Sequence, residues 1–470
     1  MTTYTEFYCD YANGNNINAG DNAANGVVSS TGGAFATNIF TALSGTPFSG
    51  VAVGDFCALS ANGATVASYI ARVTAVGGGG ATLTLSSTAK AGVSPGSTNI
   101  TATTGGVMKG PNAAVSWPLS ATTLGAITNV AGDAVRINLK NNASYAITSQ
   151  ISLAAAGPIT VEGYTTTAGD GGKAVIDGGG DGSAPNTLLV VSGGSITTRN
   201  IIGTGNNSGA TSQPAFQFSS VGKQLIEGCV VHDVRGEGFY SLIGENVFIG
   251  CEAYRCNQSN TATCAGFTTS GTATNAAFIR CISHDNSGSN AEGFRVAGST
   301  TFIDCIADTN GHIGFDCIGN LPNSFFNCVA YGNASSGIVM GNSQTNQYIF
   351  ENCIISDNGA TGITSSGAGG RIGSMRNCAF YNNTTAPSSN LKSIAESGTI
   401  TLSAPPFVAP TTGDFNLNTT AGGGASCQNL GIGTFTQTQA SYTGTTSTPS
   451  VGAAEVAAAS SSGGAYTFIG

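Results

Sequence analysis

Residues 302–316 read FIDCIADTNGHIGFD, and the pattern of this stretch returns along much of the chain. Cys305 follows the apolar Phe302 by three residues and precedes Asn310 by five, and Gly314-Phe315 completes the unit. Strands of such a repeat are expected to place apolar residues, such as Phe302, Cys305 and Ala307, on their buried face. The unit therefore predicts short strands joined by tight turns.

Three columns recur when the repeats are aligned on their cysteines. The cysteines are separated by 22, 30, 24, 23, 25 and 25 residues and are Cys229, Cys251, Cys281, Cys305, Cys328, Cys353 and Cys378. The asparagines five residues later are Asn286, Asn310, Asn333, Asn358 and Asn383. The glycine and bulky apolar pairs are Gly238-Phe239, Gly266-Phe267, Gly293-Phe294, Gly314-Phe315, Gly337-Ile338 and Gly362-Ile363. Insertions are confined to the stretch between cysteine and glycine, so the repeat is structural.

A repeat of about 24 residues cannot bury its own apolar face and must stack on similar neighbours. Stacked strands lie about 4.8 Å apart, so equivalent side chains form ladders. The cysteine column is then a stack of buried thiols that act as small hydrophobes. Disulfides are not expected along it, because the rung spacing exceeds the roughly 3.8 Å that bridged Cβ atoms prefer. The asparagine column is expected to join successive turns by hydrogen bonds.

The pattern Phe-Ile-x-Cys-Ile-Ala-x-x-Asn with its following Gly-Phe resembles the repeat of the pectate-lyase-like superfamily. The resemblance covers 225–383 and extends back through 196–205, with Asn200 in the cysteine place. It implies an all-β, right-handed, single-stranded parallel β-helix. Residues 404–418, APPFVAPTTGDFNLN, resemble the closing segment of such chains, which folds back over the last rung.

The chain is predicted to have three parts. Residues 1–112 form an opening strand and a small antiparallel β module, because 26–112 alternate strand patterns with glycine-rich turns. Residues 113–425 form the β-helix, and 426–470 form a C-terminal cap and tail. The module either covers the open end of the solenoid or docks to a larger structure, and the sequence leaves both open.

Composition excludes several classes of function. Charged residues make up only 8% of the chain, the net charge is −9, and no run of Lys or Arg occurs. Nucleic acid is not an expected partner, because binding it requires clustered cations. Nor is a membrane, because no stretch approaches 18 apolar residues. The N-terminus has no basic and apolar export signal, so secretion is not expected.

Polar side chains on the outer face provide candidate site residues. The weak catalytic candidates are His284, Asp285, Glu292 and Arg295. The weak glycan-binding candidates are His232, Tyr240, Tyr254, Arg255, Asp308, Asp316 and Tyr331. They are expected to share one side of the helix, where exposed aromatic rings beside hydrogen-bonding groups suit a sugar groove.

The alternative is an ordinary solvated face, and two observations favour it. His232 and His284 lie two rungs apart, roughly 9–10 Å, which is too far to share a metal ion. The motifs of polygalacturonases and calcium-dependent pectate lyases are also missing. No cofactor and no metal are therefore expected. Enzymatic activity stays uncertain, and a polysaccharide lyase or a glycoside hydrolase would be its form.

The leading hypothesis is a non-enzymatic structural protein of a tailed-phage virion, a capsid decoration protein or a fibre. It rests on likeness to phage β-helix proteins, which implies a homotrimer bound to other virion proteins, such as a major capsid or tail protein. Assembly in the reducing host cytoplasm agrees with free thiols. The redox states of Cys9, Cys57, Cys256, Cys264, Cys317 and Cys427 stay open. The alternative function is a tailspike-like protein that binds or degrades surface polysaccharides.

Overall fold

The computed structural model describes residues 134–428 with short gaps, and parts of 4–109. The gaps in the first range are 149, 156–157, 181–185, 207–212, 221, 258–263, 272–274, 320, 342–346, 368–370, 389–391 and 394–395. The described parts of the second range are 4–9, 29–31, 33–36, 39–42, 44–53, 56–60, 69–92 and 107–109. The tail predicted beyond 428 and the predicted boundary between 112 and 113 lie outside the described residues.

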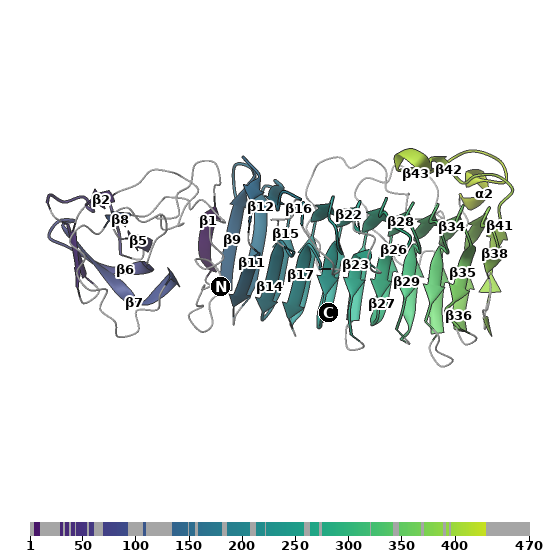
Figure 1. The fold of residues 1–470 in the computed structure, drawn as a ribbon, viewed down its shortest axis with the longest axis horizontal. Coiled ribbons are helices and arrows are strands. Elements are labelled where there is room, and N and C mark those ends of the chain that lie inside the picture. The colour runs from purple at the N-terminus through teal and green to yellow at the C-terminus, as the bar shows by residue number, and fades with distance from the viewer. Residues whose placement is uncertain are drawn as a thin grey trace.

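Three parallel sheets run side by side along a rod (Figure 1). Sheet 1 contains β1 (Tyr4–Cys9), β9 (Ala134–Lys140), β12 (Ile159–Tyr164), β15 (Ile196–Arg199), β18 (Lys223–Glu227), β21 (Glu245–Ile249), β24 (Asn275–Ile279), β27 (Ser299–Ile303), β30 (Asn323–Phe326), β33 (Gln347–Glu351), β36 (Arg371–Arg376), β39 (Lys392–Ser393) and β40 (Glu396–Ser397). Sheet 2 contains β10 (Tyr145–Ala146), β13 (Ala174–Asp177), β16 (Ile201–Thr204), β19 (Val230–His232), β22 (Glu252–Tyr254), β25 (Ile282–His284), β28 (Ile306–Asp308), β31 (Val329–Tyr331), β34 (Ile354–Ser356), β37 (Ala379–Tyr381) and β41 (Ile400–Thr401). Sheet 3 contains β11 (Ile151–Ala155), β14 (Leu189–Gly193), β17 (Phe216–Ser220), β20 (Phe239–Ser241), β23 (Cys264–Thr269), β26 (Ala291–Val296), β29 (Phe315–Cys317), β32 (Ile338–Met340), β35 (Thr361–Ser365) and β38 (Ala386–Ser388).

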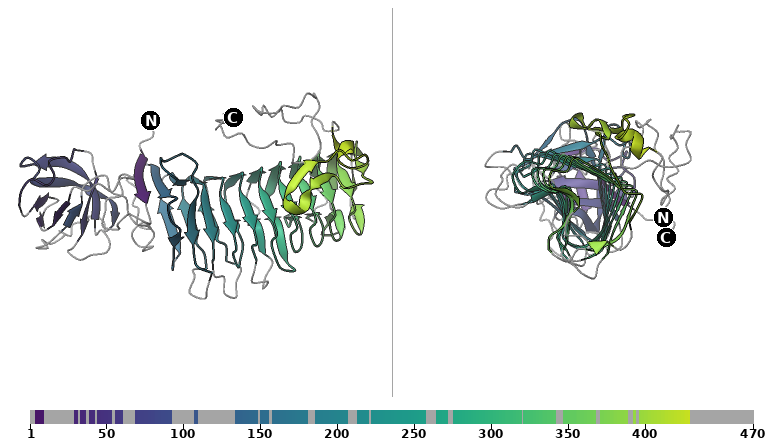
Figure 2. Two further views of the ribbon diagram at one scale, coloured as in Figure 1. Left: turned by 90° about the horizontal axis from the view of Figure 1, so that it is seen from above. Right: turned by 90° about the vertical axis from the view of Figure 1, so that its right-hand side faces the viewer.

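The chain visits sheets 1, 2 and 3 in turn, and each strand pairs with the strand one turn earlier and one turn later. This winding is a right-handed parallel β-helix, the hand of nearly all parallel crossovers. Viewed along the rod, successive turns superimpose (Figure 2). The predicted fold class is confirmed.

The N-terminal module is a seven-stranded antiparallel sheet in the order β2-β8-β5-β6-β7-β4-β3. Its strands are β2 (Ser29–Thr31), β3 (Gly33–Ala36), β4 (Ile39–Ala42), β5 (Phe56–Ser60), β6 (Tyr69–Gly77), β7 (Thr82–Gly92) and β8 (Val107–Lys109). It lies beyond the β9 end of the rod (Figure 1). Strand β1 precedes the module in sequence yet pairs with β9, so the module is inserted after the first strand of sheet 1.

Two columns of phenylalanine rings fill the core. From sheet 1, Phe248, Phe278, Phe302, Phe325 and Phe350 stack with ring centroids 4.8–5.2 Å apart. From sheet 3, Phe239, Phe267, Phe294 and Phe315 stack at 4.8–4.9 Å. The columns meet edge to face, as where Phe278 lies 5.4 Å from Phe294. This spacing is that of the rungs, so the register of the sheets imposes the stacking.

The seven cysteines of the repeat are free and buried beside these rings. Five of their sulfurs lie near backbone carbonyls of the preceding turn; the Cys305 Sγ, for example, lies 3.2 Å from the Phe278 oxygen. Burial raises the pKa of Cys229, Cys251 and Cys378, which keeps these thiols neutral. Cys256, Cys264, Cys317 and Cys427 are also free and buried. The side chains of Cys9 and Cys57 lie outside the described residues.

One-residue turns in the left-handed conformation join sheet 1 to sheet 2. Asn, Asp or Gly fill most of these positions, because they tolerate positive φ. Asn200, with φ of 54°, is such a turn residue and aligns with Gly228. The expectation that Asn200 takes the cysteine place is therefore wrong by one residue, and the buried Ile201 aligns with Cys229.

The asparagine column forms a hydrogen-bonded ladder between sheets 2 and 3. Asn310 Nδ2 donates to Asn333 Oδ1 at 2.9 Å, and Asn333 Nδ2 donates to Asn358 Oδ1 at 3.0 Å. Asn286 donates to Asn310 at 2.7 Å, and Asn358 to Asn383 at 2.8 Å. Each of these amides except the half-buried Asn383 is buried. The ladder satisfies polar groups that the turns carry into the interior.

The C-terminal segment folds back over the outer face of sheet 2. Its elements span 407–427, so most of them lie before residue 426, where the cap was predicted to start. They are β42 (Phe407–Ala409), a 3-10 helix (Pro410–Thr412), β43 (Asp414–Leu417) and α2 (Gly424–Cys427). Phe407, Phe415 and Cys427 form an apolar cluster with Val329 and Ile354. The last rungs of sheet 2 are therefore shielded from water.

The ladder predicts a difference between Asn333→Ala and Asn383→Ala. Asn333 has neighbours on both sides and is fully buried, whereas Asn383 ends the column. Asn333→Ala leaves buried donors and acceptors unsatisfied and should lower the free energy of unfolding by about 2–4 kcal/mol, against about 1 kcal/mol for Asn383→Ala. Urea denaturation of both variants measures this. Equal effects would contradict the ladder.

Candidate functional site

The predicted site residues lie on two faces, not on one. Sheet 2 places His232, Tyr254, His284, Asp308 and Tyr331 in a single outward column. Sheet 3 places Tyr240, Glu292, Arg295 and Asp316 on another face. The expectation of one shared side is corrected, because the turn that carries the asparagine ladder redirects the chain between the two columns.

On sheet 2 the aromatic rings stack on one another. His232 lies 4.9 Å from Tyr254, and Tyr254 lies 5.0 Å from His284, with interplanar angles of 14° and 15°. Both faces of the Tyr254 ring are therefore covered. Tyr331 packs against Phe407 and Phe415 of the cap. A sugar needs an open ring face to stack on, so Tyr254 and Tyr331 do not offer a sugar platform.

The charges of this face pair with one another. Arg255 and Asp285 occupy left-handed turn positions, with φ of 49° and 50°. Arg255 makes two bonds of 2.6 Å to Asp233, and the hydrogen bond from Arg255 lowers the pKa of Asp233 to about 2. His284 contacts Glu252 at 3.0 Å and Asp285 at 2.9 Å. Burial opposes protonation of His284, but these carboxylates outweigh it and raise its pKa. Burial raises the pKa of Asp308 to about 6.

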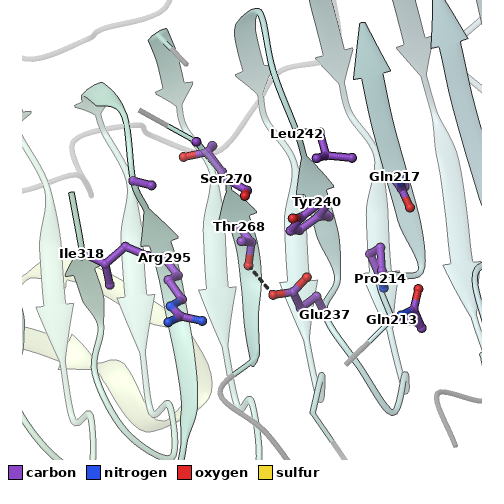
Figure 3. Close-up of a pocket in the computed structure, with 13 residues that line it drawn as sticks. Gln213, Pro214, Gln217, Glu237, Tyr240, Leu242, Thr268, Ser270, Arg295 and Ile318 are labelled. Carbon is purple, nitrogen blue, oxygen red and sulfur yellow. Dashed lines mark hydrogen bonds between the residues drawn. The ribbon is translucent and has the colours of Figure 1, made fainter. Parts of the chain in front are cut away.

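Sheet 3 carries a pocket of about 650 Å³ on its outer face (Figure 3). Side chains from β17 to β29 and from the turns beside them line it. Those that matter for recognition are Gln213, Gln217, Glu237, Tyr240, Thr268 and Arg295. Amides, hydroxyls, a carboxyl group and an aromatic ring thus converge in one concave place, which is the usual composition of a ligand site.

Glu237 lies at the centre of this pocket. It precedes β20, is only 5% exposed, and accepts a 3.0 Å hydrogen bond from Thr268 on the next rung. Burial raises its pKa to about 7, against the lowering effects of Thr268 and Arg295. A buried carboxyl group that titrates near neutrality in a pocket is a candidate proton donor.

Two further buried acids, Glu292 and Asp316, lie two and three rungs after Glu237. Glu292 is 2% exposed and has Arg295 Nε at 3.5 Å and His312 Nδ1 at 3.6 Å. Asp316 is 4.0 Å from Arg295. Burial and the charge of Glu292 raise the pKa of Asp316 to about 8, and Glu292 raises the pKa of His312. Two protonatable carboxyl groups, Glu237 and Asp316, therefore flank Arg295.

Glu237 and His312 were not among the predicted site residues. Glu237 could have been found from its position in the repeat, because it stands two residues before Phe239 of a Gly-Phe pair, as Glu292 stands two residues before Phe294. His312 lies in the turn before Gly314, where the repeat does not specify a residue type and so did not indicate a site residue. Within the described part of the chain, no group of three or more His, Cys, Asp or Glu side chains is placed to hold a metal ion. No described helix is long and apolar enough to cross a membrane.

Comparisons with known proteins found several solved structures that resemble part of this chain at low identity. No family model and no curated protein sequence matches the chain. The pectate lyase Pel9A is 18% identical, with a TM-score of 0.46 over 73% of this chain and 91% of that chain. The periplasmic alginate epimerase AlgG is 13% identical, with a TM-score of 0.39 over 57% of this chain and 77% of that one. ORF18 of Geobacillus virus E2 is 13% identical, with a TM-score of 0.31 over 59% of this chain and 56% of that chain. These similarities concern the fold alone.

The raised pKa of Glu237 makes stability depend on pH. The folded protein disfavours the ionised carboxylate. The free energy of unfolding therefore falls as the pH rises from 4.5, the pKa of a glutamate in the unfolded chain, to about 7, its pKa in the folded protein. Glu237→Gln removes this loss of stability. The variant should be about 1–3 kcal/mol more stable than the wild type above neutral pH, and the difference should shrink towards pH 4.5.

Urea denaturation across this pH range measures the effect. Glu245→Gln is the matched control, because Glu245 is exposed at the start of β21. A Glu237→Gln variant whose stability advantage is the same at every pH would show that the carboxyl group does not titrate in this way.

Proposed function

We propose that this chain is a non-enzymatic structural component of a tailed-phage particle, a capsid decoration protein or a fibre. The observation that supports this most is the continuous strand pairing of the three sheets from β9 to the cap. Such a rod resists bending and local unfolding, because each rung is held by hydrogen bonds and ring stacking on both sides. The N-terminal module lies at one end of the rod, so in this proposal it is a separate unit through which the rod attaches to the particle.

In this proposal the chain assembles in the host cytoplasm as a homotrimer and attaches to a major capsid or tail protein. The free thiols suit a reducing compartment, where disulfides do not persist. The low content of charged residues, 8%, suits a protein that works packed against others.

Mass spectrometry of purified particles tests this proposal. The chain should be present in multiple copies per particle, and mild dissociation should release it as a trimer. A chain that is absent from particles, or present only in traces, would contradict the structural role.

A second candidate function is binding or degradation of a surface polysaccharide, as in a tailspike. It is favoured by the pocket on sheet 3, where the Tyr240 ring is adjacent in its column to Gln217 and Thr268, neither of which is aromatic. Its ring faces are therefore not taken by stacked rings as those of Tyr254 are. With the hydroxyl and amide groups nearby, this side chain can stack on a sugar.

The two faces of the helix allow a controlled test of this second function. Tyr240→Ala should weaken glycan binding about tenfold or more, the loss expected when an aromatic platform is removed. His284→Ala on sheet 2 should leave binding unchanged. If the glycan is also cleaved, Glu237→Gln and Glu292→Ala should abolish turnover while His284→Ala retains it. Equal losses in Tyr240→Ala and His284→Ala would exclude the pocket as the site.

A further inference from the structure

The outer face of sheet 1 differs in composition from the outer faces of sheets 2 and 3. Its strands alternate buried residues with partly exposed ones, and the partly exposed side chains point outward. The aliphatic ones among them form a stripe from β18 to β33, the aliphatic stripe, which consists of Leu225, Val247, Ile249, Ala277, Ile279, Ile303 and Ile349. The outward column of sheet 3 has no aliphatic member from β17 to β29 and reads Gln217, Tyr240, Thr268, Arg295 and Asp316.

The centre of the aliphatic stripe is a ladder. Ile249, Ile279 and Ile303 occupy equivalent positions on consecutive rungs, and Phe326 continues the column. Rungs are about 4.8 Å apart, so these side chains form a continuous apolar surface. Each isoleucine directly follows a phenylalanine of the core column, so these strands are apolar on both faces. Strands of this kind are typical of sheets that are covered on both sides.

The cap shows how this chain covers another apolar column. On sheet 2, Val329, Ile354 and Ala379 are buried in one cluster with Phe407 and Phe415 of the cap. Among the described residues, this cluster contains none from sheet 1. The outer face of sheet 1 thus has an apolar surface that the described part of the cap does not cover. Contiguous apolar surface on an outer face is typical of an interaction site.

The charges that border the aliphatic stripe are paired. In the ladder column, Glu227 precedes Ile249, and Glu351 follows Phe326. The pairs at the borders are Arg199 with Glu227 at 2.9 Å, Arg376 with Glu351 at 3.7 Å and Lys223 with Glu245 at 4.0 Å. The net charge of −9 makes copies of this chain repel one another, but the charges of these pairs cancel. On this face, two copies can therefore meet without opposing like charges that lack a counter-ion.

The size of the face suits a second rod of the same length. Sheet 1 is paired from β9 to β36, which is ten rungs. At about 4.8 Å for each rung and about 16 Å for a strand of five residues, this face offers roughly 700 Å². A specific protein interface buries about 800 Å² on each partner. A copy of this chain presents a stripe of the same length, with its charge pairs at the same distances from the centre.

We propose that copies of this chain associate through the aliphatic stripe, side by side and in parallel, so that Ile279 and Ile303 of one copy meet the same residues of another. The inference deepens the structural role proposed above and depends on it for the direction of the rods, because rods that attach to a particle through one end point the same way. Contact at equal heights places apolar rungs against apolar rungs and leaves the charge pairs at the rim.

Sedimentation of the full chain over a range of concentrations tests the surface. Ile279→Asp and Ile303→Asp should each raise the dissociation constant of the assembly about tenfold or more, because a charge replaces a central apolar contact. Ile318→Asp is the matched control, because Ile318 is 46% exposed just after β29 of sheet 3; it should leave the assembly unchanged. Resistance of the buried repeat cysteines to iodoacetamide shows that each variant is folded.

Oxidation of an Ile303→Cys variant tests the direction of the rods. Parallel copies at equal heights bring the two residue-303 thiols together, so a disulfide-linked dimer should form. Gln217→Cys on sheet 3 should not form this dimer. An antiparallel pair centred between Ile279 and Ile303 would place each of these residues opposite the other. Cross-linking only in a mixture of Ile279→Cys and Ile303→Cys chains would therefore overturn the parallel arrangement.

The remaining outcomes separate this inference from the structural role. A monomeric wild-type chain, or equal losses of association in Ile303→Asp and Ile318→Asp, would overturn the aliphatic stripe as a surface for self-association. If that chain is nevertheless abundant in purified particles, the structural role stands without it. A monomer in which the Ile303→Cys thiol resists iodoacetamide would show that another segment of the same chain covers the stripe, and would also overturn the inference.

Discussion

The structure depends on one constraint, the hydrogen-bonded register between successive rungs. Each strand of the three parallel sheets pairs with its equivalents one turn away, so identical sequence positions are stacked about 4.8 Å apart. This spacing is close to the stacking distance of aromatic rings, and the phenylalanine columns exploit it. The same register aligns the buried thiols and brings the asparagine amides within hydrogen-bond distance of one another.

The register also decides what the outer faces can do. Where three rings follow one another in a column, as in His232, Tyr254 and His284, they cover each other's faces and their flanking charges pair locally. Where a ring stands between residues that are not aromatic, as Tyr240 does, its faces are left to a ligand. The charges of the sheet 2 face therefore pair with one another, while the sheet 3 face has a pocket that is lined by the buried Glu237.

Much of the fold could be predicted from the sequence, because a repeat of cysteine, asparagine and glycine-phenylalanine positions fixes which residues stack. Phe278 and Phe302, expected to face the interior, are fully buried. The site was harder to predict. Spacing along the chain gives the distance between two residues in one column, but it does not say that the turn at Asn286 or Asn310 sends the next column to another face. The contact between Tyr331 and Phe407 joins positions far apart in sequence, and no local pattern indicates it. In the sequence, Glu237 is not distinguished from other acids of the outer face, because its burial depends on contacts with neighbouring rungs, such as that with Thr268.

The central claim is that the repeat cysteines share one continuous dry core with the phenylalanine columns. Thiol labelling of the native protein with iodoacetamide, followed by mass spectrometry of each cysteine peptide, tests it directly. Cys229, Cys251, Cys281, Cys305, Cys328, Cys353 and Cys378 should stay unlabelled until the protein unfolds and should then become reactive together. Rapid labelling of several of these cysteines in the native protein would show that they do not lie in a common core.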